Sequence, residues 1–202
     1  GSLNLSLDPV ATAKTYAENG AAAISVITEK SYFKGNNAFL TAVKDEVNLP
    51  ILRKDFIIDE IQLYETLNMG ADMVLLIAGI LSYSRLLKLI ETCSRLSIEP
   101  LVEVHSELEA KMLADLPIRI AGINNRNLND FTVDINHSLR LAEFIPDNIF
   151  KVSESGISKP ADLLCLEKHG FNAALIGEAL VTSSSPAQKL KELANYQVKL
   201  YD

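Results

Sequence analysis

The sequence predicts an α/β fold with a parallel sheet, of the (β/α)8 TIM-barrel class. Seven short apolar runs alternate with amphipathic stretches at regular spacing along the chain. The runs are almost continuously apolar, which is typical of strands that are covered on both faces, as in parallel sheets. The expected strands lie at residues 22–27, 51–56, 73–77, 101–104, 118–123, 150–153 and 173–176.

A closed barrel is favoured over an open sheet. An open seven-stranded sheet would leave two strands with unpaired backbone groups, whereas a closed eight-stranded barrel leaves none. Such barrels typically contain about 250 residues, and this chain of 202 residues opens on a helical pattern. We therefore expect residues 1–202 to form a single barrel domain that begins at the loop after the first strand, with strand 1 and the N-terminal extra helix absent from the sequence. A seven-stranded domain that carries a Gly-Ser tag remnant is the alternative.

Helix boundaries follow from capping signals. Asp8-Pro9 predicts an N-cap with proline in the first turn, in a helix that ends near Asn19-Gly20. A later helix begins at Asp59-Glu60 and carries apolar residues along one face. Those residues are Ile61, Tyr64 and Leu67.

Composition argues against several classes of partner. The net charge is −7, and Lys and Arg are scattered, so neither nucleic acid nor an anionic membrane is expected as the main partner. No run of about 18 apolar residues and no apolar leader occurs, which favours a cytoplasmic protein, or an organellar one without its transit peptide. Cys93 and Cys165 lie in apolar helical patterns and are expected to be buried free thiols. The histidines lack the spacing of zinc ligands.

Polar residues concentrate where the predicted strands end. In such barrels the active site lies at the C-terminal ends of the strands. A charged side chain inside an apolar strand is costly to bury unpaired, and such groups concentrate at functional sites. Interior ion pairs are the alternative for any one of them. The residues concerned are Lys54, Asp55, Glu103, Asn124, Asn125, Arg126, Glu154, Ser155 and Glu178.

The last two predicted loops carry a signature of phosphate binding. Gly156 and Gly177 follow the final two strands, where many barrels hold a substrate phosphate on backbone N–H groups. This indicates a phosphorylated metabolite as the small-molecule partner. Local positive charge near the same end would suit an anionic substrate. It would come from Lys30, Lys34, Arg53, Lys54 and Arg126.

Six motifs follow one another in order along the whole chain. They lie at residues 23–28 with 33–35, 52–59, 101–105, 122–128, 153–157 and 175–180. Together they resemble the motifs of indole-3-glycerol phosphate synthases. The run Gly122-Ile123-Asn124-Asn125-Arg126-Asn127-Leu128 is close to diagnostic.

The resemblance implies a lyase of tryptophan biosynthesis. Such enzymes close the indole ring of 1-(2-carboxyphenylamino)-1-deoxyribulose 5-phosphate with loss of CO₂ and water, and need no metal or organic cofactor. Lys54 would be the general acid at the ribulose carbonyl oxygen, and Glu103 the acid/base partner in the later dehydration. Asn124 would orient a substrate hydroxyl or that carboxylate. Glu154 and Ser155 would line the pocket and hold the lysine and the polar groups of the substrate.

The same resemblance implies an apolar wall and a phosphate site. The wall for the anthranilate ring would comprise Ser25, Ile27, Phe33, Phe56 and Leu76. Arg126 would order the polar side chains at the substrate-binding end of the barrel. The phosphate would lie against Gly156, Gly177 and the amide of Glu178. A monomer or weak homodimer is expected.

One departure from the family concerns the start of the chain. Members carry, on strand one, a Glu and a Lys followed by Ser-Pro-Ser, one residue and Gly, and Gly1 aligns with that glycine. The absent Lys would bind the substrate carboxylate, and the absent Ser belongs to the phosphate site. A polypeptide that began at Gly1 is therefore expected to be crippled or inactive.

Two alternatives stay open. Another phosphate-binding barrel, such as phosphoribosylanthranilate isomerase, would use a Cys and an Asp as acid and base, but no Cys lies at a predicted strand end. A non-catalytic fragment or scaffold would keep the phosphate site without the strand-one residues.

Overall fold

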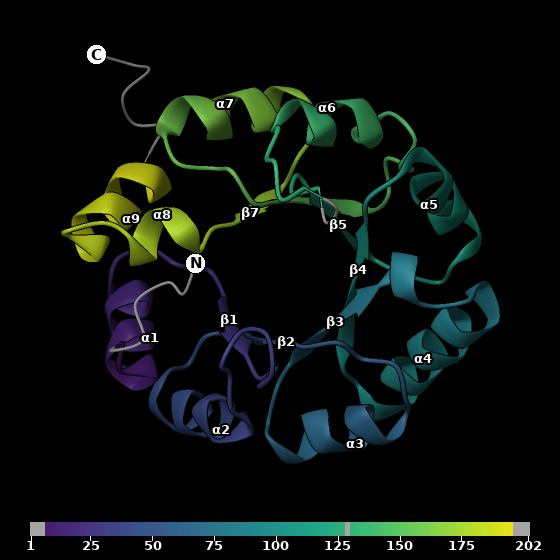
Figure 1. The fold of residues 1–202 in the computed structure, drawn as a ribbon, viewed down its shortest axis with the longest axis horizontal. Helices are drawn as coiled ribbons and strands as arrows, with labels where there is room; N and C mark the ends of the chain where they lie inside the picture. The colour runs from purple at the N-terminus through teal and green to yellow at the C-terminus, as the bar shows by residue number, and fades with distance from the viewer. Residues whose placement is uncertain (1–6, 128–129, 196–202) are drawn as a thin grey trace. The chain divides into compact units, whose positions relative to one another are not determined.

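The computed structural model describes residues 7–127 and 130–195. Within them, seven strands occur in the sheet in the order β1-β2-β3-β4-β5-β6-β7, and helices connect them (Figure 1). The predicted parallel α/β fold is therefore confirmed. Gly1, the predicted loop glycine, lies outside the described residues. No helix of the described part is both long and apolar enough to cross a lipid bilayer.

The elements have the following bounds. The strands are β1 (Ile24–Ile27), β2 (Ile51–Lys54), β3 (Met73–Ile77), β4 (Glu99–Val104), β5 (Ile120–Asn124), β6 (Phe150–Glu154) and β7 (Ala173–Leu175). The α-helices are α1 (Pro9–Glu18), α2 (Asn37–Glu46), α3 (Ile61–Asn68), α4 (Tyr83–Leu96), α5 (Glu107–Met112), α6 (Asn136–Ala142), α7 (Pro160–Lys168), α8 (Glu178–Val181) and α9 (Pro186–Ala194). The chain divides into two compact units, Gly1–Val102 and Glu103–Asp202, which are described in turn.

In the first unit, apolar side chains join β1 and β2 to α1 and α2. Ile24 and Val26 of β1 are buried in one cluster with Leu40 and Val43 of α2. Because successive strand residues point to opposite faces, these contacts define the helix-facing side of β1. The predicted cap of α1 is confirmed, since the Asp8 carboxylate accepts the N–H of Val10 at 2.9 Å.

The apolar face of α3 is not its buried face. The three apolar residues along one face of the helix are exposed, at 62% for Ile61, 45% for Tyr64 and 45% for Leu67. Leu63 and Thr66 are buried instead. The reason is the neighbouring strand: position 53 of β2 is an arginine that points toward α3, so the helix presents polar partners to it.

In the second unit, β5, β6 and β7 pair in parallel. Asn124 is in register with Glu154, and Glu154 with Leu175. Figure 1 shows α6 and α7 beside these strands. Ser153 of β6 is hydrogen-bonded to Ser138 of α6 at 2.7 Å, which identifies the helix-facing side of β6. Glu154, one residue further on, therefore points to the opposite face.

Candidate active site

The carboxyl end of β2 places Lys54 among residues of the predicted site. The register pairs Ser25 with Leu52 and Ile27 with Lys54, and neighbours in a parallel pair point to the same face. Because Ile24 and Val26 face the helices, Ser25 and Ile27 lie on the other face, together with Lys54. In the first unit, the structure therefore brings these three predicted residues to one face of the sheet.

Leu76 does not share the face of Lys54. The register pairs Arg53 with Val74, so Val74 and, by alternation, Leu76 point toward the helices. Leu75 points the other way, to the face of Lys54, and is also buried. Three consecutive buried leucine and valine residues, 74–76, carry no periodicity that could have distinguished Leu75 from Leu76 in the sequence.

An aromatic cluster lies beyond the ends of β1 and β2. The rings of Phe33 and Phe56, both predicted wall residues, have centroids 6.3 Å apart. Tyr32 packs edge-on against Phe56 at 6.1 Å and is 79% exposed. Tyr32 is not among the predicted wall residues, although it directly precedes Phe33.

Glu29 holds the loop after β1, which carries Tyr32 and Phe33 of this cluster. Its carboxylate accepts the backbone N–H groups of Ser31, Tyr32 and Phe33 at 2.7, 2.7 and 3.0 Å. Desolvation alone would raise the pKa of Glu29, but these hydrogen bonds outweigh it and lower the pKa below its ordinary value. Gly35 closes the loop, because a Cβ there would overlap the backbone oxygen of Ile27.

Arg53 does not supply positive charge to the predicted substrate-binding side. Its side chain is on the helix-facing side of β2 and donates to the carboxylate of Asp55 at 3.0 Å. The Arg53 residue is only 2% exposed. The prediction of local positive charge therefore does not hold for Arg53.

In the second unit, Asn124 joins two of the predicted catalytic residues. Its Nδ2 donates to Oε1 of Glu103 at 3.3 Å, and its Oδ1 accepts the Ser155 hydroxyl at 2.9 Å. The backbone N–H of Arg126 donates to the same Oδ1 at 3.0 Å. Glu154 lies on the same face as Asn124 by register. Glu103 and Glu154 are both buried, as a site that excludes water requires.

His105 approaches the Glu103 carboxylate from the same segment of chain. Its Nε2 lies 3.1 Å from Glu103 Oε1, within ion-pair distance, although the ring is not turned to make a hydrogen bond. The backbone N–H of His105 donates to Glu109 at 2.8 Å, so this position also caps the turn that leads into α5. His105 is not among the predicted site residues, although it closes the predicted motif at residues 101–105.

The Asn125 side chain holds the loop after β6 through three hydrogen bonds. Its Oδ1 accepts the N–H of Ser138 at 2.9 Å, and its Nδ2 donates to Ser153 Oγ and to the carbonyl of Ser155, both at 3.0 Å. Ser155 and Gly156 both have positive φ, 68° and 81°. Asn125 thus holds the carbonyl of a strained turn that begins the predicted phosphate loop.

The predicted phosphate-binding residues flank an ion pair. Arg126 Nη2 lies 2.8 Å from Glu178 Oε2, so the Glu178 side chain turns toward Arg126. Gly177 is the N-cap of the short α8, and a Cβ there would meet no atom within 4 Å. Gly156 needs to be glycine, since a Cβ would come within 2.5 Å of Val133 Cγ1.

The fold matches that of solved structures of other proteins. One is 3-hexulose-6-phosphate synthase from Salmonella typhimurium, with a TM-score of 0.77 over 91% of this chain and 90% of that chain. The sequence identity is 13%, so this similarity concerns the fold alone.

Sequence comparisons identify the family. The family model described as indole-3-glycerol phosphate synthase matches residues 1–193. The indole-3-glycerol phosphate synthase of Carboxydothermus hydrogenoformans is 45% identical over 96% of this chain and 74% of its own length. That of Lachnoclostridium phytofermentans is 42% identical over 96% of this chain and 71% of its own length. The chain therefore belongs to the indole-3-glycerol phosphate synthase family.

Proposed function

We propose that the chain carries the catalytic residues of an indole-3-glycerol phosphate synthase acting on 1-(2-carboxyphenylamino)-1-deoxyribulose 5-phosphate. The observation that carries this proposal is the family match along residues 1–193. The positions of Lys54, Glu103, Asn124 and Ser155, at or just beyond the carboxyl ends of strands, support it.

Lys54 acts as the general acid in the ring closure. The ring carbon that bears the carboxylate attacks the ribulose carbonyl carbon, and the carbonyl electron pair moves to its oxygen. An ammonium group at that oxygen stabilises the developing charge and delivers the proton. Loss of CO₂ returns an electron pair to the ring.

Glu103 serves the dehydration that follows. Hydroxide leaves the former carbonyl carbon as water, and the adjacent methylene carbon next to the ring nitrogen loses a proton, which forms the carbon–carbon double bond of the indole while the nitrogen keeps its own proton. The hydrogen bond from Asn124 Nδ2 holds one oxygen of Glu103, and Ser155 in turn fixes Asn124. A carboxylate oriented in this way can accept or return a proton without rotating away from the substrate.

The remaining residues bind the two ends of the substrate. Ser25, Ile27, Phe33 and Phe56 contact the anthranilate ring, and Leu75 takes the place expected for Leu76 because it shares the face of Lys54. Gly156, Gly177 and the amide of Glu178 bind the phosphate. Arg126 orders this end through its ion pair with Glu178.

The complete catalytic domain is a closed (β/α)8 barrel with one further strand beside β1. Two observations support this. Ser25 is exposed and Ile27 is 38% exposed on the face that carries Lys54, and β1 stands at one end of the described strand order. A covering strand would bury Ile27 and pair the open edge of β1.

The cysteines disfavour the isomerase alternative. Cys93 lies in α4, and burial, reinforced by the nearby Glu99, raises its pKa to about 12. Cys165 lies in α7. Neither of these thiols stands at a strand end, where an acid/base cysteine would be required.

The test is formation of indole glycerol phosphate by the purified protein, assayed as the chain alone and together with any residues that precede Gly1 in the natural protein. Lys54→Ala should reduce kcat by about 10²- to 10⁴-fold, because it removes the general acid. Lys168→Ala, which changes an exposed lysine at the end of α7, is the matched control and should turn over normally. Normal turnover by Lys54→Ala would refute the assignment.

A further inference from the structure

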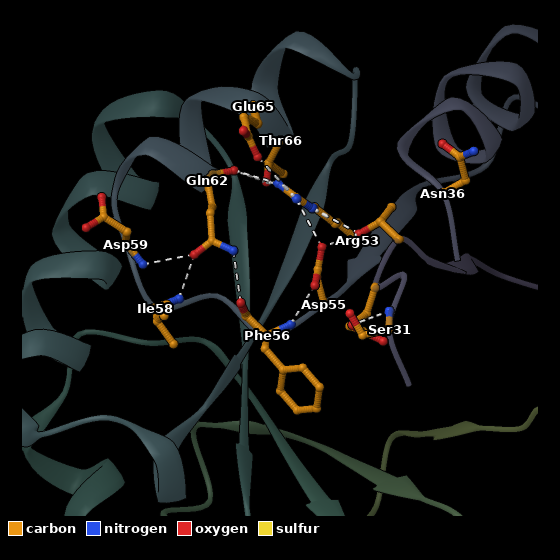
Figure 2. A network of polar contacts seen from close by, with 12 residues as sticks. Ser31, Asn36, Arg53, Asp55, Phe56, Ile58, Asp59, Gln62, Glu65 and Thr66 are labelled. Carbon is orange, nitrogen blue, oxygen red and sulfur yellow. Dashed lines mark hydrogen bonds and ion pairs between the residues drawn. The ribbon is translucent and has the colours of Figure 1, made fainter. Parts of the chain in front are cut away.

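A buried polar network surrounds Arg53 at the carboxyl end of β2 (Figure 2). The guanidinium donates to the carbonyl of Gln62 at 2.7 Å and to the hydroxyl of Thr66 at 2.9 Å, both in α3. On its other side it donates to Asp55 Oδ2 at 3.0 Å and to Thr28 Oγ1 at 3.2 Å. One buried cation thus connects α3 to the segments that follow β1 and β2.

Thr28 is the link between these two strand ends. Its hydroxyl donates to Asp55 Oδ2 at 2.7 Å while accepting from Arg53, and its own backbone N–H donates to the carbonyl of Lys54 at 3.1 Å. Thr28 is 2% exposed, so water does not compete for these bonds. One small side chain and its amide therefore contact residues 53, 54 and 55 together.

The backbone just beyond Lys54 is also held by hydrogen bonds from side chains of this network. Asp55 Oδ1 accepts the N–H of Phe56 at 2.9 Å, and the Gln62 amide donates to the carbonyl of Phe56 at 2.9 Å. Gln62 Oε1 also accepts the N–H groups of Ile58 and Asp59 at 2.8 and 3.0 Å. Figure 2 shows Gln62 between these backbone groups.

We propose that Thr28 and Asp55, held by Arg53, are positioning residues that set the direction of the Lys54 side chain. This rests on the role proposed above for Lys54. The residues on both sides of Lys54 are anchored on the helix-facing side, so alternation directs Lys54 to the opposite face with little rotational freedom of its backbone.

The expected consequence is confined to the chemical step. A general acid must reach the carbonyl oxygen in a narrow geometry, and a shift of about 1 Å can cost about a hundredfold in rate. Substrate affinity depends mainly on the aromatic wall and the phosphate loops, which the Thr28 hydroxyl does not touch. Loss of the Thr28 hydroxyl alone therefore lowers kcat and leaves KM nearly unchanged.

The test replaces the Thr28 hydroxyl in the natural full-length protein. Thr28→Val keeps the shape of the side chain and should lower kcat by roughly tenfold to a hundredfold, with KM within about twofold of wild type. Thr28→Ser restores a hydroxyl and should recover kcat to within about threefold. Asp55→Asn, which keeps the side-chain size, carries the test if Thr28→Val does not fold.

Thr92 provides a matched control. It is a fully buried threonine of α4 whose hydroxyl likewise lies between a carboxylate, Glu60 at 3.0 Å, and an arginine, Arg95 at 2.6 Å. Thr92→Val should lower the melting temperature about as much as Thr28→Val and leave kcat unchanged. Wild-type kcat in folded Thr28→Val, or an equal loss in Thr92→Val, would overturn the proposal.

A second readout separates this inference from the proposed function. The NMR signal of the Lys54 side-chain CεHε group should shift in Thr28→Val, return in Thr28→Ser and stay unchanged in Thr92→Val, whether or not the protein turns over the substrate. Absence of turnover by the wild-type protein would refute the proposed function, and the Lys54 signal would then still test the positioning role. An unchanged Lys54 signal in Thr28→Val would refute the positioning role.

Discussion

Asn125 shows how a single buried amide can shape a loop. It has three hydrogen-bond partners, Ser138, Ser153 and Ser155, and is 3% exposed. A buried polar group left without its partner costs about 1–3 kcal/mol. The positive φ values of Ser155 and Gly156 persist because this amide and its neighbours hold them.

Replacing Asn125 by alanine should therefore be costly. The change removes the Asn125 partner of the buried Ser138 N–H and of the Ser155 carbonyl, while the Ser153 hydroxyl keeps its bond to Ser138, and we expect the free energy of unfolding to fall by about 3 kcal/mol. Urea denaturation measures this loss. Asn136→Ala, at an exposed position of α6, should change the same quantity by less than about 0.5 kcal/mol. Equal losses in the free energy of unfolding in the two variants would show that the buried Asn125 amide contributes no more to stability than an exposed one.

At the scale of the element, the loop after β1 depends on one carboxylate. The ionised form of Glu29 accepts three backbone N–H groups, and its pKa lies below the ordinary value of 4.5. A depressed pKa in the folded state contributes stability above the ordinary pKa, which is lost as the pH falls through the folded-state pKa. At neutral pH the loop is therefore fully held, and it should loosen only in acid.

The amides of Ser31, Tyr32 and Phe33 should report this loosening. We expect their NMR signals to shift together as the pH falls below 4.5, because protonation of Glu29 weakens all three hydrogen bonds. Glu29→Gln should abolish the pH dependence and increase amide exchange in the loop already at pH 7. The same titration curve in Glu29→Gln would assign the transition to another group.

The positions of strands and helices were easier to predict from the sequence than which face of each is buried. Near-continuous apolar runs such as 73–77 located the strands, and Asp8-Pro9 located the start of α1, because capping and burial are local properties of the sequence. The inward face of α3 was not predictable, since it depends on Arg53 of β2 pointing toward it. Leu75 and Leu76 could be separated only by the register with β2. The residue types of the candidate site were visible, whereas the contacts of Asn125 and Thr28 depend on pairings between distant segments.

At the scale of the whole molecule, β4 spans the boundary between the two compact units. Its residues 99–102 belong to the first unit and residues 103–104 to the second. Unfolding of either unit removes part of this strand, and the strand order continues from β3 through β4 to β5. We therefore expect the chain to unfold in one cooperative transition, as single domains usually do.

Cys93 offers a measure of that transition. It is fully buried in α4, and its pKa of about 12 leaves almost no thiolate at pH 7, so a thiol reagent should modify it only after the first unit unfolds. Labelling of Cys93 across a urea series should therefore follow the same midpoint as circular dichroism and as a fluorescent label placed in α7 of the second unit. Coincident midpoints are expected because β4 is shared. Cys93 labelling at a lower urea concentration than loss of the second unit would instead show that residues 1–102 unfold independently.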